Sequence, residues 1–172
     1  MALFADERGA VLSPCGTFRY YLWREWDASK PTMLLLMLNP SRADHRRDDH
    51  TITKSIAIAR NLGFGRLDVG NLAAFRSSDP GELRHASDPV GPENDAHLRR
   101  MLSDAHTTVC AWGANATLLP GRVEIVSALM RAAGVTPYAL KLTNGGYPSH
   151  PLARGKGFIP TTVSLIPFPI GG

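Results

Sequence analysis

The most constraining feature of the sequence is an unbroken run of six apolar residues, Met33 to Leu38, that stops at Asn39-Pro40. A continuous apolar run of this length between turn residues is typical of a strand that is buried on both faces. Proline has no backbone N–H to donate to a neighbouring strand, so we expect the strand to end there. The run therefore predicts a buried strand whose carboxyl end is at Asn39.

Strand and helix candidates alternate through the rest of the chain. In chain order we expect a helix at 51–62, a strand at 66–71, a helix at 93–103, a strand at 107–112, a helix at 123–133 and a strand at 136–142. This alternation implies crossover connections, and hence a parallel sheet with helices on both faces. The expected fold class is α/β, a three-layer α/β/α sandwich with a central four-stranded parallel sheet. Residues 17–26 and 158–168 would add one or two antiparallel strands.

The length of 172 residues predicts a single α/β domain over 1–172, with 1–30 as an N-terminal strand or hairpin extension and 31–172 as the core. No stretch approaches the ~20 apolar residues of a membrane span, so we expect no membrane partner. The first residues lack a signal-peptide pattern, which predicts a cytoplasmic location. The formal charge of +4 permits an anionic partner without proving one.

Ligands of open parallel sheets bind outside the carboxyl ends of the strands. Four loops are expected to leave that edge, beginning at Asn39, Asn71, Gly113 and Thr143. The first of these loops holds the densest cluster of ionisable groups in the chain, which are Asp44, His45, Asp48, Asp49 and His50. The sequence therefore places the candidate site at this edge.

The acidic loop has two interpretations. Its carboxylates and imidazoles could hold a divalent metal ion. Alternatively, Asp48 and Asp49 precede a helix that starts near Thr51, where carboxylates accept hydrogen bonds from free amides. We expect at least one of the two to serve the helix in this way, and we expect neither a tightly bound metal nor another cofactor.

Several motifs between Tyr20 and Phe168 resemble a known family. They read LNPSRAD, DDHT, GNLAAFRSSDP, DPVGPEND, WGA and GYPSHPL. On these motifs the chain is identified as a member of an uncharacterised bacterial family, domain of unknown function sixteen forty-three. This resemblance covers nearly the whole chain and implies no activity.

The order of four motifs is similar to that of the uracil-DNA glycosylase superfamily. They are Leu38-Asn39-Pro40-Ser41, Asn71 in VGNLAAF, Trp112-Gly113, and Ser149-His150-Pro151-Leu152 followed by Arg154, Gly155 and Phe158. The resemblance implies a four-stranded parallel sheet between helices and a pocket for a nucleobase. The final loop lacks the Ser-Pro that follows His-Pro in that superfamily, and the insertion 44–50 is not part of its pattern.

Removing a base from a sugar requires a group that positions water and a donor beside the departing base anion. The candidate catalytic residues are Asn39, Asp44 and His150. The candidate substrate-binding residues are Pro40, Ser41, Asn71, Phe75, Trp112, Gly113, Tyr147, Ser149 and Pro151. Asn71 has the donor and the acceptor needed to read a base edge, and Phe75 or Tyr147 could stack on a base. Structural roles remain open for each: a turn at Asn39 or Asn71, and packing for His150 and the aromatic residues.

Basic residues are expected around the mouth of this cleft, where they could contact phosphates or balance the acids. They are Arg42, Arg46, Arg47, Arg154 and Lys156. Leu152 or Arg154 could also act as a wedge into a duplex. The leading hypothesis is a protein that recognises a nucleobase or nucleotide, with N-glycosidic hydrolysis as the specific reaction. The alternatives are a non-catalytic nucleotide or nucleic-acid binding module, and a metal-dependent hydrolase that uses the acidic loop.

Overall fold

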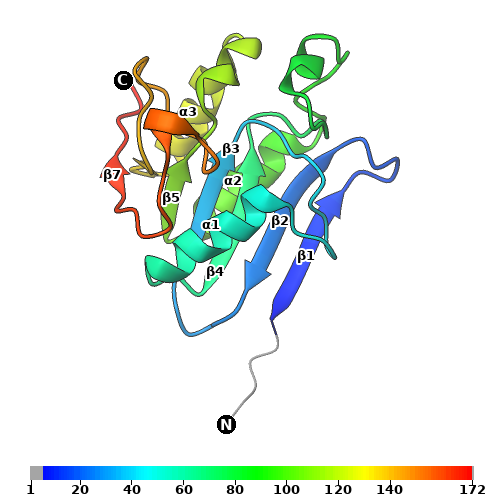
Figure 1. The fold of residues 1–172 in the computed structure, drawn as a ribbon. Helices are drawn as coiled ribbons and strands as arrows, with labels where there is room; N and C mark the ends of the chain where they lie inside the picture. Colours follow the sequence, from blue (N-terminus) through cyan, green and yellow to red (C-terminus); the bar gives the residue numbers. More distant parts are fainter. Residues whose placement is uncertain (1–5, 172) are drawn as a thin grey trace.

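The computed structural model describes residues 6–171 and has a mixed α/β fold built on one seven-stranded sheet (Figure 1). The strands are β1 (Glu7–Leu12), β2 (Arg19–Glu25), β3 (Thr32–Met37), β4 (Arg66–Asn71), β5 (Thr107–Cys110), β6 (Tyr138–Ala139) and β7 (Ile166–Pro167). Their order across the sheet is β1-β2-β4-β3-β5-β6-β7. The sheet therefore has three strands beside the four parallel ones, where one or two were expected. The four middle strands are parallel, and three antiparallel strands extend them at the edges.

Strand β3 lies at the centre of the sheet, as its apolar run predicts. It pairs in parallel with β4 and β5, so that Leu35 is opposite Val69 on one side and Val109 on the other. Each of residues 33–37 is at most 4 % exposed. An apolar strand of this kind is stable only if both of its faces are covered.

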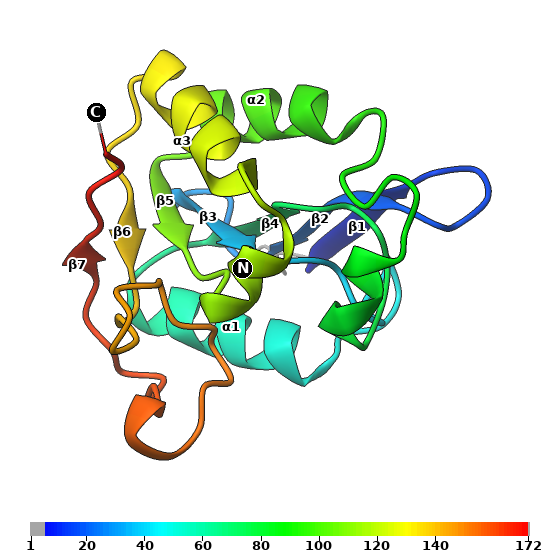
Figure 2. The same cartoon turned by 90° about the horizontal axis from the view of Figure 1, so that it is seen from above.

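Helices cover both faces of the sheet (Figure 2). They are α1 (His50–Asn61), α2 (Asn94–Asp104) and α3 (Arg122–Ala132), each within one residue of its predicted span. Because side chains alternate along a strand, Leu35 packs in the core beside α1 and Leu36 packs in the core beside α2 and α3. None of the helices described between residues 6 and 171 is long and apolar enough to cross a membrane.

The last parallel strand is shorter than the sequence indicates. Residues 136–142 were expected to form it, but β6 contains only Tyr138 and Ala139. Beyond this point the backbone bonds to itself, because Ser149 N–H donates to Lys141 O at 2.8 Å and Thr143 N–H donates to Tyr147 O at 2.8 Å. The segment therefore leaves the sheet early and forms a tight loop above its carboxyl edge.

Two buried arginines of β2 fasten the acidic loop to the sheet. Arg24, 3 % exposed, donates to the Asp48 carboxylate at 2.7 Å and to the backbone carbonyl of Asp44. Arg19, 2 % exposed, donates to the carbonyl of Ala43 at 2.8 Å. A buried guanidinium needs such partners to offset its lost hydration. The N-terminal extension thus fixes the loop that follows β3.

We expect Leu36→Ala to lower the free energy of unfolding by about 2–5 kcal/mol, because Leu36 is fully buried between β3 and the α2–α3 layer. Ile125→Ala on α3, where the side chain is 50 % exposed, is the matched control and should change stability by less than about 0.5 kcal/mol. Urea unfolding followed by circular dichroism measures both. Equal losses in the two variants would contradict the assignment of β3 to the core.

Candidate functional site

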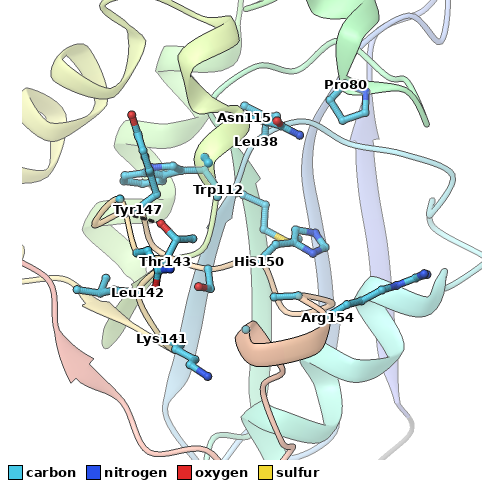
Figure 3. A pocket seen from close by; sticks show the side chains of 18 of the residues that line it. Leu38, Pro80, Trp112, Asn115, Lys141, Leu142, Thr143, Tyr147, His150 and Arg154 are labelled. Carbon is cyan, nitrogen blue, oxygen red and sulfur yellow. Dashed lines mark hydrogen bonds between the residues drawn. The ribbon is translucent and has the colours of Figure 1, made fainter.

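A pocket of about 800 Å³ opens at the carboxyl ends of β3 and β5, beneath the loop that follows β6 (Figure 3). The end of β3 contributes Leu38 and Asn39, and the end of β5 contributes Trp112 and Gly113. Most of the remaining wall comes from residues between 141 and 157. The three strand ends meet because the strands are parallel, as the sequence analysis anticipated.

One side of the pocket is apolar and aromatic. In the view of Figure 3, Trp112 and Tyr147 lie on one side, and His150 and Arg154 lie on the other. Trp112 is only 2 % exposed, and Phe168 packs edge-on against its ring at 5.7 Å between centroids. A rigid aromatic wall with polar groups opposite suits a flat ligand that has a polar edge.

Asn39 lines this pocket, and its amide nitrogen is bound to the neighbouring backbone. Its Nδ2 donates to the carbonyls of Ser77 at 3.0 Å, Pro40 at 3.2 Å and Phe75 at 3.4 Å. Carbonyls only accept, so these contacts fix the amide with its nitrogen toward the neighbouring loop. Within residues 6–171, Oδ1 has no donor. Asn39 can therefore accept a hydrogen bond from a water or ligand in the pocket.

His150 is held as a neutral imidazole. Its Nδ1 accepts the backbone N–H of Leu152 at 3.1 Å, so the ring proton is on Nε2. Burial lowers the pKa of His150 below its ordinary value of 6.5; the positive charge of Lys54 adds to this effect and the negative charge of Asp49 opposes it. At neutral pH the ring can therefore donate one hydrogen bond from Nε2 without carrying a charge.

The ionisable groups around the pocket are basic. Lys141, Arg154 and Lys156 line it, and none of the described lining residues is Asp or Glu. Arg154 and Lys156 are exposed and make no ion pair with a carboxylate in the described part of the chain. Lys141 Nζ donates to the backbone carbonyl of Lys156 at 2.7 Å, which ties the two ends of the loop together. This electrostatic environment favours an anionic ligand.

The acidic loop does not reach the pocket. Asp44 accepts the N–H groups of Arg46 and Arg47 at 2.8 and 2.9 Å, and these bonds lower the pKa of its carboxyl group. Asp48 pairs with Arg24 at 2.7 Å. Asp49 caps α1 by accepting the N–H of Ile52 at 2.9 Å, which confirms the predicted capping role.

These carboxylates therefore have structural partners already. Within residues 6–171, no group of three or more His, Cys, Asp or Glu side chains is arranged to hold a metal ion. Asp44 is not among the residues that line the pocket, so its suggested role as a base stays a prediction without geometric support.

Asn71 lies one strand away from the pocket. It pairs with Met37 in the register of β3 and β4, and by alternation both side chains are on the α1 face. Met37 lines the pocket, whereas Asn71 does not and is only 2 % exposed. Its Nδ2 is buried without a partner. The reading of a base edge by Asn71 stays a prediction, because the structure does not bring Asn71 to the pocket wall.

The remaining candidates divide into two groups. The pocket wall includes Asn39, Trp112, Gly113, Tyr147, Ser149, His150, Arg154 and Lys156. The structure does not bring the others to that wall; they are Asp44, Pro40, Ser41, Asn71, Phe75, Pro151, Arg42, Arg46 and Arg47. Ser41 instead contacts Ser78, with 3.1 Å between the two hydroxyl oxygens, and Phe75 is partly buried against the core on the α2–α3 face.

Sequence reasoning did not identify several lining residues, among them Pro80, Asn115 and Lys141. Asn115 follows the Trp112-Gly113 motif in the short helix η2 (Ala114–Leu118), and Pro80 begins η1 (Pro80–Arg84). The only signal for Asn115 and Lys141 was their closeness to strand ends. Pro80 reaches the pocket through folding of a loop that the sequence marks merely as rich in proline and aspartate.

A family model described as a protein of unknown function (DUF1643) matches residues 19–152 of the chain. The matched segment includes β2 to β6 and the part of the pocket wall up to His150. Neither the comparison with curated proteins nor the comparison with solved structures gave a match.

We expect the imidazole of His150 to titrate below pH 6.5, because burial disfavours the protonated ring. At pH values between the lowered pKa and 6.5, the unfolded chain binds a proton at His150 and the folded chain does not. Stability from the neutral ring is fully present above pH 6.5 and is lost as the pH falls through the lowered pKa.

Two-dimensional NMR of the imidazole C–H groups, assigned with His150→Gln, measures the midpoint. Wild-type protein should also lose stability relative to His150→Gln as the pH falls below 6.5. A midpoint at or above 6.5 would show that the ring is not held in its neutral form.

Proposed function

The chain belongs to the DUF1643 family, whose description gives no activity, and we propose from the pocket alone that this protein binds a nucleobase and hydrolyses its N-glycosidic bond. The observation that carries the proposal is that Asn39, Trp112 and His150 line one pocket. An aromatic wall, an amide acceptor and a neutral imidazole donor are the groups that a base and its leaving oxygen require.

The chemistry assigns each group a role. Cleavage breaks the bond between the sugar carbon and a base nitrogen, and the electron pair leaves with the base. The Nε2–H of His150 donates to the carbonyl oxygen on which this charge develops. This hydrogen bond strengthens as the anion forms, because the accepting oxygen gains negative charge. The positive charge of Arg154 and Lys156 lowers the energy of the anion further. Asn39 Oδ1 accepts a hydrogen bond from the water that attacks the sugar carbon and so orients it. The oxygen of this water becomes the new sugar hydroxyl, and its second proton ends on the departing base.

The arrangement of motifs also supports a more distant relationship. We infer that the four parallel strands β4-β3-β5-β6 correspond to the four-stranded sheet of the uracil-DNA glycosylase superfamily, with helices on both sides as three layers. The support is the order of the motifs: Asn39 follows β3, Trp112 follows β5 and His150 lies in the loop after β6. In this proposal the additional strands β1, β2 and β7 are extensions of the shared sheet.

A non-catalytic module that binds nucleotides or nucleic acid is the second candidate function. The specific observation in its favour is the lack of a carboxylate among the described residues that line the pocket. Without one, no lining side chain can act as a strong base toward water or offset positive charge on the sugar by ion pairing. The same aromatic wall and basic rim would serve binding equally well.

We expect Asn39→Ala and His150→Ala each to lower the rate of base release by ~10²-fold or more, because both groups act mainly in the transition state. The assay is release of free base from oligonucleotides that contain uracil, hypoxanthine or modified cytosine, with nucleosides in parallel. Asn61→Ala and His45→Ala, at exposed positions outside the pocket, are the matched controls.

Unchanged base release in both pocket variants would remove these residues from the mechanism. Absence of release from every substrate, together with nucleotide binding that is lost in His150→Ala, would favour the non-catalytic module. Circular dichroism of each variant checks that a lost activity is not a lost fold.

Binding to an oligonucleotide should weaken as salt is added, because phosphate contacts release counterions. The double variant Arg154→Gln, Lys156→Gln should reduce the slope of log K against log salt by about 1–2, since each lost contact contributes roughly 0.7–0.9. Arg100→Gln, exposed on α2, is the control. Filter binding at several salt concentrations measures the slopes. No affinity at ~50 mM salt would favour a free nucleotide as the ligand.

A further inference from the structure

Among the large apolar side chains of residues 6–171, that of Phe158 is the most exposed, at 58 %. It directly follows Gly157, which lines the pocket, and precedes Ile159, which is fully buried. Its backbone is therefore anchored beside the pocket while its ring faces solvent. The cores on the two faces of the sheet do not include this ring, so its position is not explained by packing.

Lys54 of α1 covers one face of the ring. Its Nζ lies 4.6 Å from the ring centroid, within the range of a cation–π contact. This contact holds the ring against the first turns of α1, and the large exposed fraction leaves the rest of the ring accessible. A fixed aromatic face that is open to solvent is a surface on which another flat group can stack.

Three basic residues either contact this ring or lie close to it in the sequence. Lys54 contacts it directly, and Arg154 and Lys156 lie on the same short segment between the pocket and Phe158. No ion pair joins any of these three cations to a carboxylate in the part of the chain that the structure describes. An aromatic ring among unpaired cations complements a ligand that combines flat rings with phosphates, and that ligand is a nucleic acid strand.

We propose that Phe158 is a stacking platform for a second base, next to the base in the pocket, and that the ligand of this site is single-stranded nucleic acid. This inference rests on the proposed function, because it takes the pocket to hold a base. Gly157 lines the pocket, and the Cα atom of Phe158 is about 3.8 Å from that of Gly157 because the two residues are adjacent in the chain. In a duplex both faces of each base are already stacked, so only an unpaired strand offers a free face to the ring.

Fluorescence anisotropy with a labelled 12-nucleotide single strand of mixed sequence tests the platform. Stacking contributes about 1–3 kcal/mol per base, so Phe158→Ala should weaken binding by about tenfold. Phe158→Tyr should restore it, because the phenol keeps a flat ring. Ile125→Ala removes a similarly exposed side chain, 50 % exposed on α3, and should leave the affinity unchanged.

Calorimetry with each of the four nucleoside monophosphates distinguishes the contribution of the Phe158 ring to binding from that of the pocket. Their binding should be the same in wild type and Phe158→Ala, and the wild type should prefer the single strand to the matching duplex. Unchanged affinity of Phe158→Ala for the single strand, or equal affinity of the wild type for strand and duplex, would overturn the inference. Binding of a monophosphate but not of the strand would also overturn it while leaving the proposed function intact. No binding of any of these ligands would reject this inference, whereas the base-release assay decides the proposed function separately.

Discussion

The burial of β3 on both faces is the constraint on which the rest of the structure depends. Because Leu35 and Leu36 point in opposite directions and neither can face water, the strand must be central and helices must cover each side of the sheet. Parallel neighbours then require crossover helices, and their carboxyl ends lie along one edge. The pocket is a direct consequence, since its wall includes the residues at which β3 and β5 end.

The carboxyl edge of the sheet has two regions that differ in charge. Arg24 and Arg19, buried in β2, hold the acidic loop by its carbonyls and by Asp48, so the carboxylates serve the scaffold. Beneath the loop after β6, the pocket is lined instead by cations and amides. A ligand in the pocket therefore meets positive charge and the neutral donor of His150, a combination that stabilises an anionic leaving group better than a cationic one.

Much of the fold could be predicted because the relevant signals are local. The run 33–38 identifies the central strand. Asp49 caps α1, as expected for a carboxylate that precedes a helix starting near Thr51. The spacing of apolar residues gives the three helices to within one residue. The length of the strand after residue 136 was overestimated, because the whole segment 136–142 has a sequence compatible with a strand. The strand ends early because residues 141–149 form hydrogen bonds with one another instead.

The sequence by itself determined the sheet edge at which the pocket opens, together with Asn39, Trp112 and His150 in its wall. Only the tertiary structure decided which other polar residues belong there. Asn71 also ends a parallel strand, but β4 lies one strand away from the pocket, and Asn71 is paired with Met37 of β3 and does not line the pocket. Lys141 enters the pocket because a loop folds back, and the acidic cluster is excluded by arginines from another strand. Strand ends are set by local composition, whereas side-chain access depends on contacts between segments far apart in the chain.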